Sequence, residues 1–262
     1  MNLQLNNRTA IVCGSTQGIG KCIAHEMAAN GANVVLVARN EEKLKTVVET
    51  LDTSSGQKHH LLIADFSKPE ELAATLDTYI QNGGDAHILV NNTGGPKGGP
   101  IFDAAVDEFY AAFTQHLVCN HILVQKLVPL MKKNGYGRII NIISTSVKQP
   151  LNGLGVSNTI RGAVANWSKT LANELGQFNI TVNNVLPGAT NTERLKSIAS
   201  SKSEKSGETV DAVFNTMANE VPMKRIAQPE EVANAVVFLA SEAASYINGI
   251  NVPVDGGRTK SL

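Results

Sequence analysis

The stretch Arg8–Ala29 constrains the fold of this chain more than any other part of its sequence. It opens on a short apolar run that stops abruptly at Gly14. Apolar residues then recur at helical spacing until Asn30-Gly31, a pair that commonly ends helices. This order predicts a buried strand, a glycine loop and a helix, which together form the first unit of a parallel α/β sheet.

The glycine loop is a candidate phosphate site. The backbone N–H groups of a glycine turn can approach an anion closely, and the following helix adds the positive end of its dipole. We therefore expect a dinucleotide diphosphate as the ligand. The glycines have the order G-x-x-x-G-x-G and not G-x-G-x-x-G, so a turn with a purely structural role is an open alternative. The candidate residues are Gly14, Ser15, Thr16, Gln17, Gly18, Ile19 and Gly20.

Length and composition restrict the classes of function. A chain of 262 residues, 42% hydrophobic and 18% charged, suits one α/β domain with a large core. Its 23 basic and 23 acidic residues balance, which argues against nucleic acid or an anionic membrane as partner. The sequence has no membrane-spanning apolar run and no signal peptide, so we expect a cytoplasmic protein. The three cysteines have no metal-like spacing, which predicts a reducing compartment and no metal site.

The alternation of strands and helices continues along the chain. It predicts a Rossmann-type doubly wound parallel sheet between two layers of helices, with residues 1–262 in a single domain. The polar segment 190–221 is rich in Ser and Lys, and we interpret it as a mobile helical flap over the ligand crevice. Six further strands are expected over 34–38, 59–64, 86–90, 137–143, 180–186 and 250–254, and helices over 41–51, 69–81, 104–133 and 156–178 and from 229 onward.

Arg39 bears on the choice of cofactor. In dinucleotide-binding folds an acidic residue after the second strand binds the adenosine ribose, whereas an arginine there suits a 2′-phosphate. This sequence has Ala38-Arg39 and no acid before Glu41. We therefore expect NADP(H) in preference to NAD(H). A solvated arginine at the end of a strand is the alternative.

The motifs taken together resemble the short-chain dehydrogenase/reductase family over almost the whole chain. The resemblance implies that Gly14 to Ile19 hold the diphosphate, and that Asp65 and Phe66 lie at the adenine. It also implies that Asn92 and Gly94 bind a ribose and that the segment with Pro187, Gly188 and Thr192 binds the nicotinamide amide. The matching pieces are Gly14-x-x-x-Gly18-Ile-Gly20, Asp65, Asn91-Asn92-x-Gly94, Arg138-Ile-Ile-Asn141 before Ser144, Leu171-Ala-Asn-Glu174, Val182-Asn183, Pro187-Gly188 with Thr192, and Asp255-Gly-Gly257.

The same resemblance indicates an altered catalytic set. Members of the family use a Ser, a Tyr-x-x-x-Lys pair and an Asn. Counts forward from Ser144 and back from Ser168-Lys169 both place Ser157 at the tyrosine position and Arg161 at the lysine position. A count back from Pro129 places His116 at the Asn position. We expect Ser144 to orient the substrate oxygen and Arg161 to bind the nicotinamide ribose.

The source of the proton is then an open question. Lys148, in the loop before the active-site helix, would serve if burial depressed its pKa, and otherwise it is a solvated lysine. Ser157 relaying through water, or water itself, is a second candidate. His116 and His121 titrate near neutrality in general, but a histidine on a long helix is more often a packing or interface residue.

Three functions remain open on the sequence. The first is an NADP(H)-dependent oxidoreductase acting on a small carbonyl or alcohol. The pattern Ser144-Thr-Ser-Val-Lys148 with Ser157-Asn158, Arg161 and the long flap also resembles a bacterial subgroup similar to β-ketoacyl-[acyl-carrier-protein] reductases, although fold alone does not give function. The second is an inactive NADP(H)-binding sensor or scaffold. The third is a structural protein without nucleotide, which leaves the motifs at the strand ends unexplained. The resemblance also implies a homo-oligomer, a tetramer or dimer, formed through the helices at 104–133 and 156–178.

Overall fold

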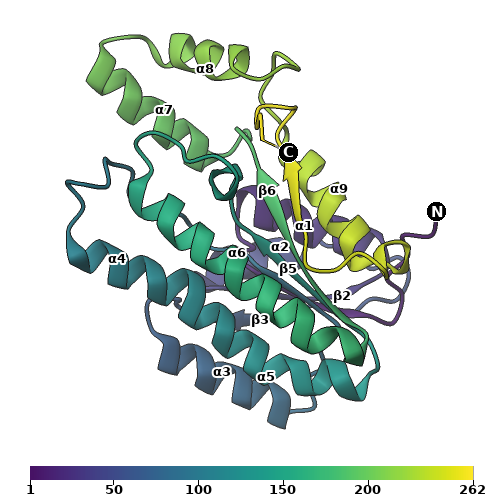
Figure 1. Cartoon of the computed structure of the whole chain (residues 1–262). Helices are drawn as coiled ribbons and strands as arrows, with labels where there is room; N and C mark the ends of the chain where they lie inside the picture. Colours follow the sequence, from purple (N-terminus) through teal and green to yellow (C-terminus); the bar gives the residue numbers. More distant parts are fainter. Residues whose placement is uncertain (262) are drawn as a thin grey trace.

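The centre of the molecule is a seven-stranded parallel sheet in the order β3-β2-β1-β4-β5-β6-β7 (Figure 1). The structure, a computed structural model, describes residues 1–261. β1 pairs with both β2 and β4, so the order in which strands are added to the sheet reverses at β1. In such sheets the ligand crevice lies at the carboxyl ends of the strands where the order reverses. The strands are β1 (Thr9–Cys13), β2 (Asn33–Ala38), β3 (His60–Ile63), β4 (Ile88–Asn91), β5 (Gly137–Ile142), β6 (Ile180–Pro187) and β7 (Asn251–Val254).

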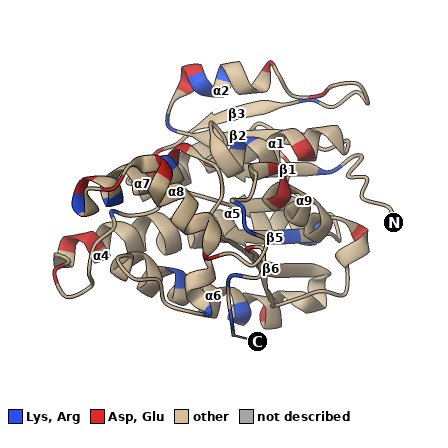
Figure 2. Cartoon of the chain, turned by 90° about the horizontal axis from the view of Figure 1, so that it is seen from above, with Lys and Arg blue, Asp and Glu red and all other residues tan. Residues whose placement is uncertain are grey.

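Helices cover both faces of the sheet. α1 and α9 pack against each other on one face, and α3, α5 and α6 cover the other (Figure 1). Lys and Arg are interspersed with Asp and Glu in the view from above (Figure 2). The helices are α1 (Gly18–Ala29), α2 (Glu41–Val48), α3 (Pro69–Gln81), α4 (Val106–Phe113), α5 (Cys119–Lys133), α6 (Gly155–Leu175), α7 (Glu193–Ser206), α8 (Val210–Asn219) and α9 (Pro229–Ala240).

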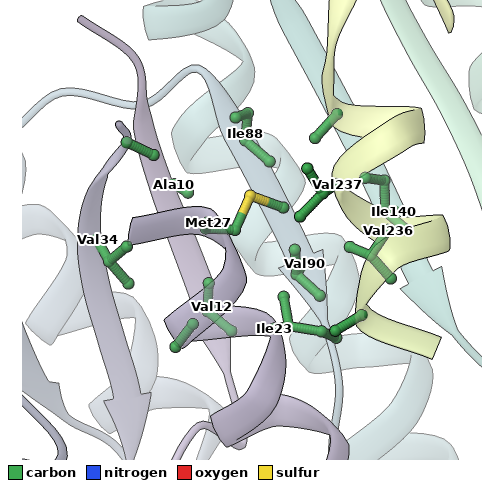
Figure 3. Close-up of a cluster of buried hydrophobic side chains, with 14 of the residues drawn as sticks. Ala10, Val12, Ile23, Met27, Val34, Ile88, Val90, Ile140, Val236 and Val237 are labelled. Atoms are coloured by element: carbon green, nitrogen blue, oxygen red, sulfur yellow. The ribbon is translucent and has the colours of Figure 1, made fainter. Parts of the chain in front are cut away.

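The core explains why the central strands read as continuous apolar runs. A parallel strand with helices on both faces buries every side chain. On the α1–α9 face, Val12 of β1 and Val90 of β4 pack with Ile23 and Met27 of α1 and Val236 of α9 (Figure 3). The opposite face buries the alternate residues of the same strands. The expected three-layer architecture is therefore confirmed.

The helix expected over 104–133 is interrupted. A π-helical turn, Thr114–Val118, separates α4 from α5. Such turns insert an extra residue into the helical ladder and occur frequently at functional sites. Here the turn carries His116, at the candidate Asn position. The helix expected over 156–178 is α6 followed by a short 3₁₀ turn, Gly176–Phe178.

The segment expected as a flap contains two helices, α7 and α8. They pack on each other through Ala199, Val213 and Met217, a small cluster separate from the main cores. Figure 1 shows them beyond the carboxyl ends of the strands, at the top of the view. Within residues 1–261, no helix is both long and apolar enough to cross a membrane.

Candidate active site

The glycine loop is held tightly between two neighbouring strand ends. Gly14 has a φ of +59° and donates its N–H to the carbonyl of Val37, 2.8 Å away. A Cβ on Gly14 would lie 2.6 Å from the carbonyl oxygen of Asn92, and one on Gly20 would collide with the carbonyl oxygen of Gly14. Asn92 in turn donates from Nδ2 to the carbonyls of Cys13 and Gly14, at 3.2 and 3.3 Å. Only glycine at these two positions permits such close approach.

The loop contains polar groups that have no hydrogen-bond partner among the described residues. Ser15 is fully buried, and its Oγ has no hydrogen-bond partner among the described residues. Gln17, the N-cap of α1, makes no side-chain capping bond, and the first turn of α1 carries no acidic residue. A buried hydroxyl without a partner is costly, and free N–H groups at a helix start favour an anion. These residues fit a diphosphate.

The segment after β6 faces the glycine loop from the other side of the crevice. Thr192 caps α7, its Oγ1 accepting from the N–H of Leu195 at 3.3 Å. A Cβ on Gly18 would lie 3.2 Å from Cγ2 of Thr192, so the two segments approach closely. Gly188 packs against Asp255 in the loop after β7. Thr192 therefore lies beside the glycine loop, and Gly188 lies beside the loop after β7.

Three candidate residues follow strand ends. Arg39 comes after β2, and Asp65 and Phe66 come after β3. Arg39 is exposed and forms no salt bridge with any residue in the described part of the chain. Asp65 accepts hydrogen bonds from the N–H and the hydroxyl of Ser67, at 2.9 and 2.8 Å. These bonds, with a smaller contribution from the charge of Arg39, lower the pKa of Asp65. Phe66 is half-buried against the core beside α5.

The candidate catalytic residues lie on the turn after β5 and on α6. Ser144 caps a 3₁₀ turn, Thr145–Val147, and its Oγ accepts from the N–H of Ser146 at 3.1 Å. Lys148 follows this turn and is half-buried. Ser157 and Arg161 occupy the first two turns of α6 and, four residues apart, share one helix face.

Arg161 is a buried cation. It is 8% exposed, and its one hydrogen bond, from Nη1, goes to the carbonyl of Ile142 at 2.9 Å. Burial and, secondarily, the charge of Arg194 lower its pKa to about 10. Arg161 therefore remains charged at neutral pH. The carbonyl that it contacts belongs to Ile142, two residues before Ser144.

His116 lies beside Arg161 and is neutral. It is 2% exposed, its Nδ1 lies 2.6 Å from Oγ1 of Thr93, and its Nε2 has no partner among residues 1–261. Burial, and then the charge of Arg161, lower its pKa to about 2. His116 thus has no imidazolium proton to give at neutral pH.

His121 lies elsewhere. It is exposed on α5, and its Nδ1 accepts from Nε1 of Trp167 at 3.3 Å. Trp167 is ten residues after Ser157 on α6, about 15 Å along the helix. His121 therefore lies too far from the candidate catalytic turn to donate a proton there.

Arg194, in the first turn of α7, was not predicted from the sequence as a site residue. Its Nη2 donates to the carbonyl of Pro96 at 2.6 Å, and its guanidinium covers Gly95. Arg194 thus joins the flap to the loop after β4. Its position two residues after the Thr192 cap is the one local signal that could have singled it out.

Comparison with known proteins places this geometry in a family. Residues 14–259 match the family described as enoyl-(acyl carrier protein) reductase. The NADPH-dependent reductase BacG of Bacillus subtilis is 32% identical over 259 residues, which cover 98% of this chain and 100% of BacG. The chain belongs to the short-chain dehydrogenase/reductase family. The resemblance noted in the sequence is confirmed at this level.

Two further members of the family connect it to particular substrates. The 3-oxoacyl-[acyl-carrier-protein] reductase FabG of Pseudomonas aeruginosa is 32% identical over 257 residues, 97% of this chain and 98% of that protein. The L-sorbose reductase of Gluconobacter frateurii, in a structure with NADPH and L-sorbose, superposes with a TM-score of 0.93 at 34% identity, with each chain fully covered. Short-chain dehydrogenase/reductases similar to this chain are thus oxidoreductases acting on small molecules, and several use NADPH.

Proposed function

We propose that this protein is an NADP(H)-dependent oxidoreductase that interconverts a carbonyl and an alcohol on a small molecule, as 3-oxoacyl reductases do. The observation that carries the proposal is the phosphate cradle, in which the buried Ser15 hydroxyl and the uncapped start of α1 lack partners. Arg39, exposed and without a carboxylate partner, supplies a cation where a 2′-phosphate would lie. The use of NADPH by BacG and by L-sorbose reductase supports the same cofactor here.

The cofactor, when bound, supplies the hydride, and the residues of the chain bind, orient and protonate. In this proposal the hydroxyl of Ser144 donates a hydrogen bond to the substrate oxygen. Arg161 holds the nicotinamide ribose and adds positive charge where negative charge develops on that oxygen. Thr192 and the Pro187-Gly188 turn hold the nicotinamide amide, and Asn92 and Gly94 hold a ribose.

The proton reaches the substrate oxygen by a route other than a tyrosine. The four tyrosines of the sequence lie at 79, 110, 136 and 246, and none lies on α6. We propose Lys148, or water positioned by Ser157, as the donor. General acid catalysis contributes roughly 10²- to 10⁴-fold, so a poorer donor slows the reaction without abolishing it.

A catalytically inactive, NADP(H)-binding sensor or scaffold is the second candidate. Ser157 and Arg161 at the tyrosine and lysine positions, with a neutral His116 beside them, favour it. The two candidates share the cofactor and differ in turnover alone.

One experiment distinguishes them. NADPH oxidation is followed with a panel of ketones, aldehydes and 3-oxoacyl thioesters, while NADPH binding is titrated on the same preparation. Turnover with any member supports the oxidoreductase. Tight binding without turnover leaves the sensor, and absence of binding contradicts both.

We also propose a homo-oligomer in the cytoplasm, with a small-molecule carbonyl or alcohol as its substrate. An apolar surface gathers on α4 and the loop before it, where side chains that ordinarily face the core lie in solvent. Phe102 is 96% exposed and Tyr110 67%. Exposed apolar patches of this kind are typical of protein interfaces.

A further inference from the structure

The flap helices α7 and α8 have a core of their own. They pack on each other through Ala199, Val213 and Met217, which belong to neither of the two main cores. Figure 1 shows the pair beyond the carboxyl ends of the strands. Elements that share few buried contacts with the rest of a protein open at a lower cost than the core does. The position of the flap therefore depends on its points of attachment.

One attachment is a neck at the base of the flap, where residues 189–191 lie beside residues 227–228. The N–H of Asn191 donates to the carbonyl of Ala227 at 2.8 Å, and the N–H of Ala227 donates to the carbonyl of Ala189 at 2.9 Å. The side-chain amide of Asn191 also donates to Oε1 of Gln228 at 3.3 Å. These bonds fix the base of the flap, and a few residues of this kind are enough to serve as a hinge.

The other attachment is the side chain of Arg194. Its Nη2 donates to the carbonyl of Pro96 at 2.6 Å, and a Cβ on Gly95 would lie 3.6 Å from the same nitrogen. Among the described residues, this is the sole hydrogen bond or salt bridge between residues 193–219 and any residue outside 190–228. One side chain thus ties the two helices to the body of the protein.

The loop that accepts this bond is held independently of the flap. At its start, Asn92 bonds the glycine loop. Three residues after Pro96, the N–H of Gly99 donates to the carbonyl of Gly153 at 2.8 Å, and the carbonyl of Gly99 accepts from the N–H of Gly155, the first residue of α6, at 3.1 Å. Because these bonds flank Pro96 on both sides, its carbonyl is a fixed acceptor.

The bond also places the start of α7 across the crevice. Thr192, the N-cap of α7, lies beside the glycine loop after β1, since a Cβ on Gly18 would be 3.2 Å from Cγ2 of Thr192. Arg194, two residues later, reaches the loop after β4. The first turn of α7 therefore spans the ends of two neighbouring strands, β1 and β4.

We infer that Arg194 is a positioning residue, whose bond to the carbonyl of Pro96 latches the flap over the crevice and thereby controls how fast NADP(H) leaves. The inference rests on the proposed function for the identity of the ligand. Arg194 is exposed, so its bond shifts the equilibrium between latched and unlatched flap by about threefold to tenfold and does not seal the crevice.

The test compares variants of the full-length protein that each change one side chain of α7. Arg194→Met removes the donor, and Arg194→Lys keeps one. Lys196→Met is the matched control, because it removes an exposed cation whose partner, Glu193, lies on the same helix. Hydrogen exchange of peptides covering residues 195–219 measures opening of the flap without NADPH. Displacement of bound NADPH in a stopped-flow chase gives its dissociation rate.

We expect Arg194→Met to raise both rates about threefold or more, Arg194→Lys to reverse part of the increase, and Lys196→Met to change neither. Exchange in the central strands should be the same in all four proteins, which shows that each variant is folded. If either rate is unchanged in Arg194→Met, or rises equally in Lys196→Met, the inference is overturned. Absence of NADPH binding contradicts the proposed function instead, and the exchange rates still test the latch.

Discussion

At the scale of single residues, the chemistry of the crevice depends on which groups are charged. Arg161 stays cationic because its pKa, although lowered by burial, is still about 10. His116 stays neutral because burial and Arg161 together lower its pKa to about 2. The cationic Arg161 and the neutral His116 therefore suit this part of the crevice to binding an anion or a polarised oxygen more than to donating a proton.

Placing the family's Tyr and Lys at 157 and 161, where we propose that Ser and Arg replace them, should raise reductase activity. In the double variant Ser157→Tyr/Arg161→Lys, a phenol next to an ammonium group gains a lowered pKa and becomes a general acid. We expect kcat for carbonyl reduction to rise about tenfold or more. Ser157→Phe/Arg161→Lys, which has the ring without the hydroxyl, is the matched control. Equal kcat for the two double variants would indicate that the crevice is shaped for a different reaction.

Neutral, buried His116 should make the protein less stable in mild acid. Its folded-state pKa lies below the unfolded value, so between these values the unfolded chain binds the proton and the folded chain does not. Stability is therefore lost as the pH falls from 7 to 5, by about 1–2 kcal/mol for this group. Urea unfolding at pH 7 and at pH 5 gives the free energy of unfolding at each pH, and the difference measures this loss.

His116→Asn should reduce that loss, because asparagine does not titrate. His121→Asn, which changes an exposed histidine of α5, should leave the loss unaltered. The same slope in wild type and His116→Asn would contradict the burial of a neutral imidazole.

At the scale of elements, the glycine loop and the start of α1 fit together without room for a side chain. Gly20→Ala places a methyl group on the carbonyl of Gly14, and we expect it to destabilise the fold by about 1–3 kcal/mol and to weaken NADPH binding. Gly162→Ala, in open space on α6, should leave stability unchanged or raise it by about 0.5–1 kcal/mol. Thermal melts of both variants, with and without NADPH, measure the change in stability and in NADPH binding. A Gly20→Ala protein as stable as wild type would be incompatible with the observed contact.

The strands and helices could be predicted from the sequence because their signals are local. The apolar run before Gly14 and the stop at Asn30-Gly31 lie within or beside the element they define. The π-helical turn at His116 could not be predicted, because one extra residue leaves the apolar spacing of a long helix almost unchanged. The contact between Arg194 and Pro96 joins residues 98 positions apart, and no local pattern encodes it.

At the scale of the whole molecule, the exposed apolar surface of α4 predicts self-association. Phe102→Asp should shift the protein toward a smaller assembly, because a buried carboxylate without a partner is strongly unfavourable. Phe102→Leu keeps an apolar surface and should retain the assembly. Light scattering after gel filtration gives the mass of each. A wild-type monomer, or an assembly unchanged by the aspartate, would contradict an interface at this surface.

For the whole molecule, the proposed function requires a crevice that binds a phosphorylated dinucleotide. Calorimetric titration of the purified protein with NADPH and with NADH tests this most directly. Arg39→Asp is measured beside Lys58→Asp, which makes the same charge change before β3, at the amino ends of the strands. We predict that NADPH binds about tenfold or more tightly than NADH, and that Arg39→Asp, but not Lys58→Asp, removes the preference. Absence of heat with either coenzyme would contradict the account.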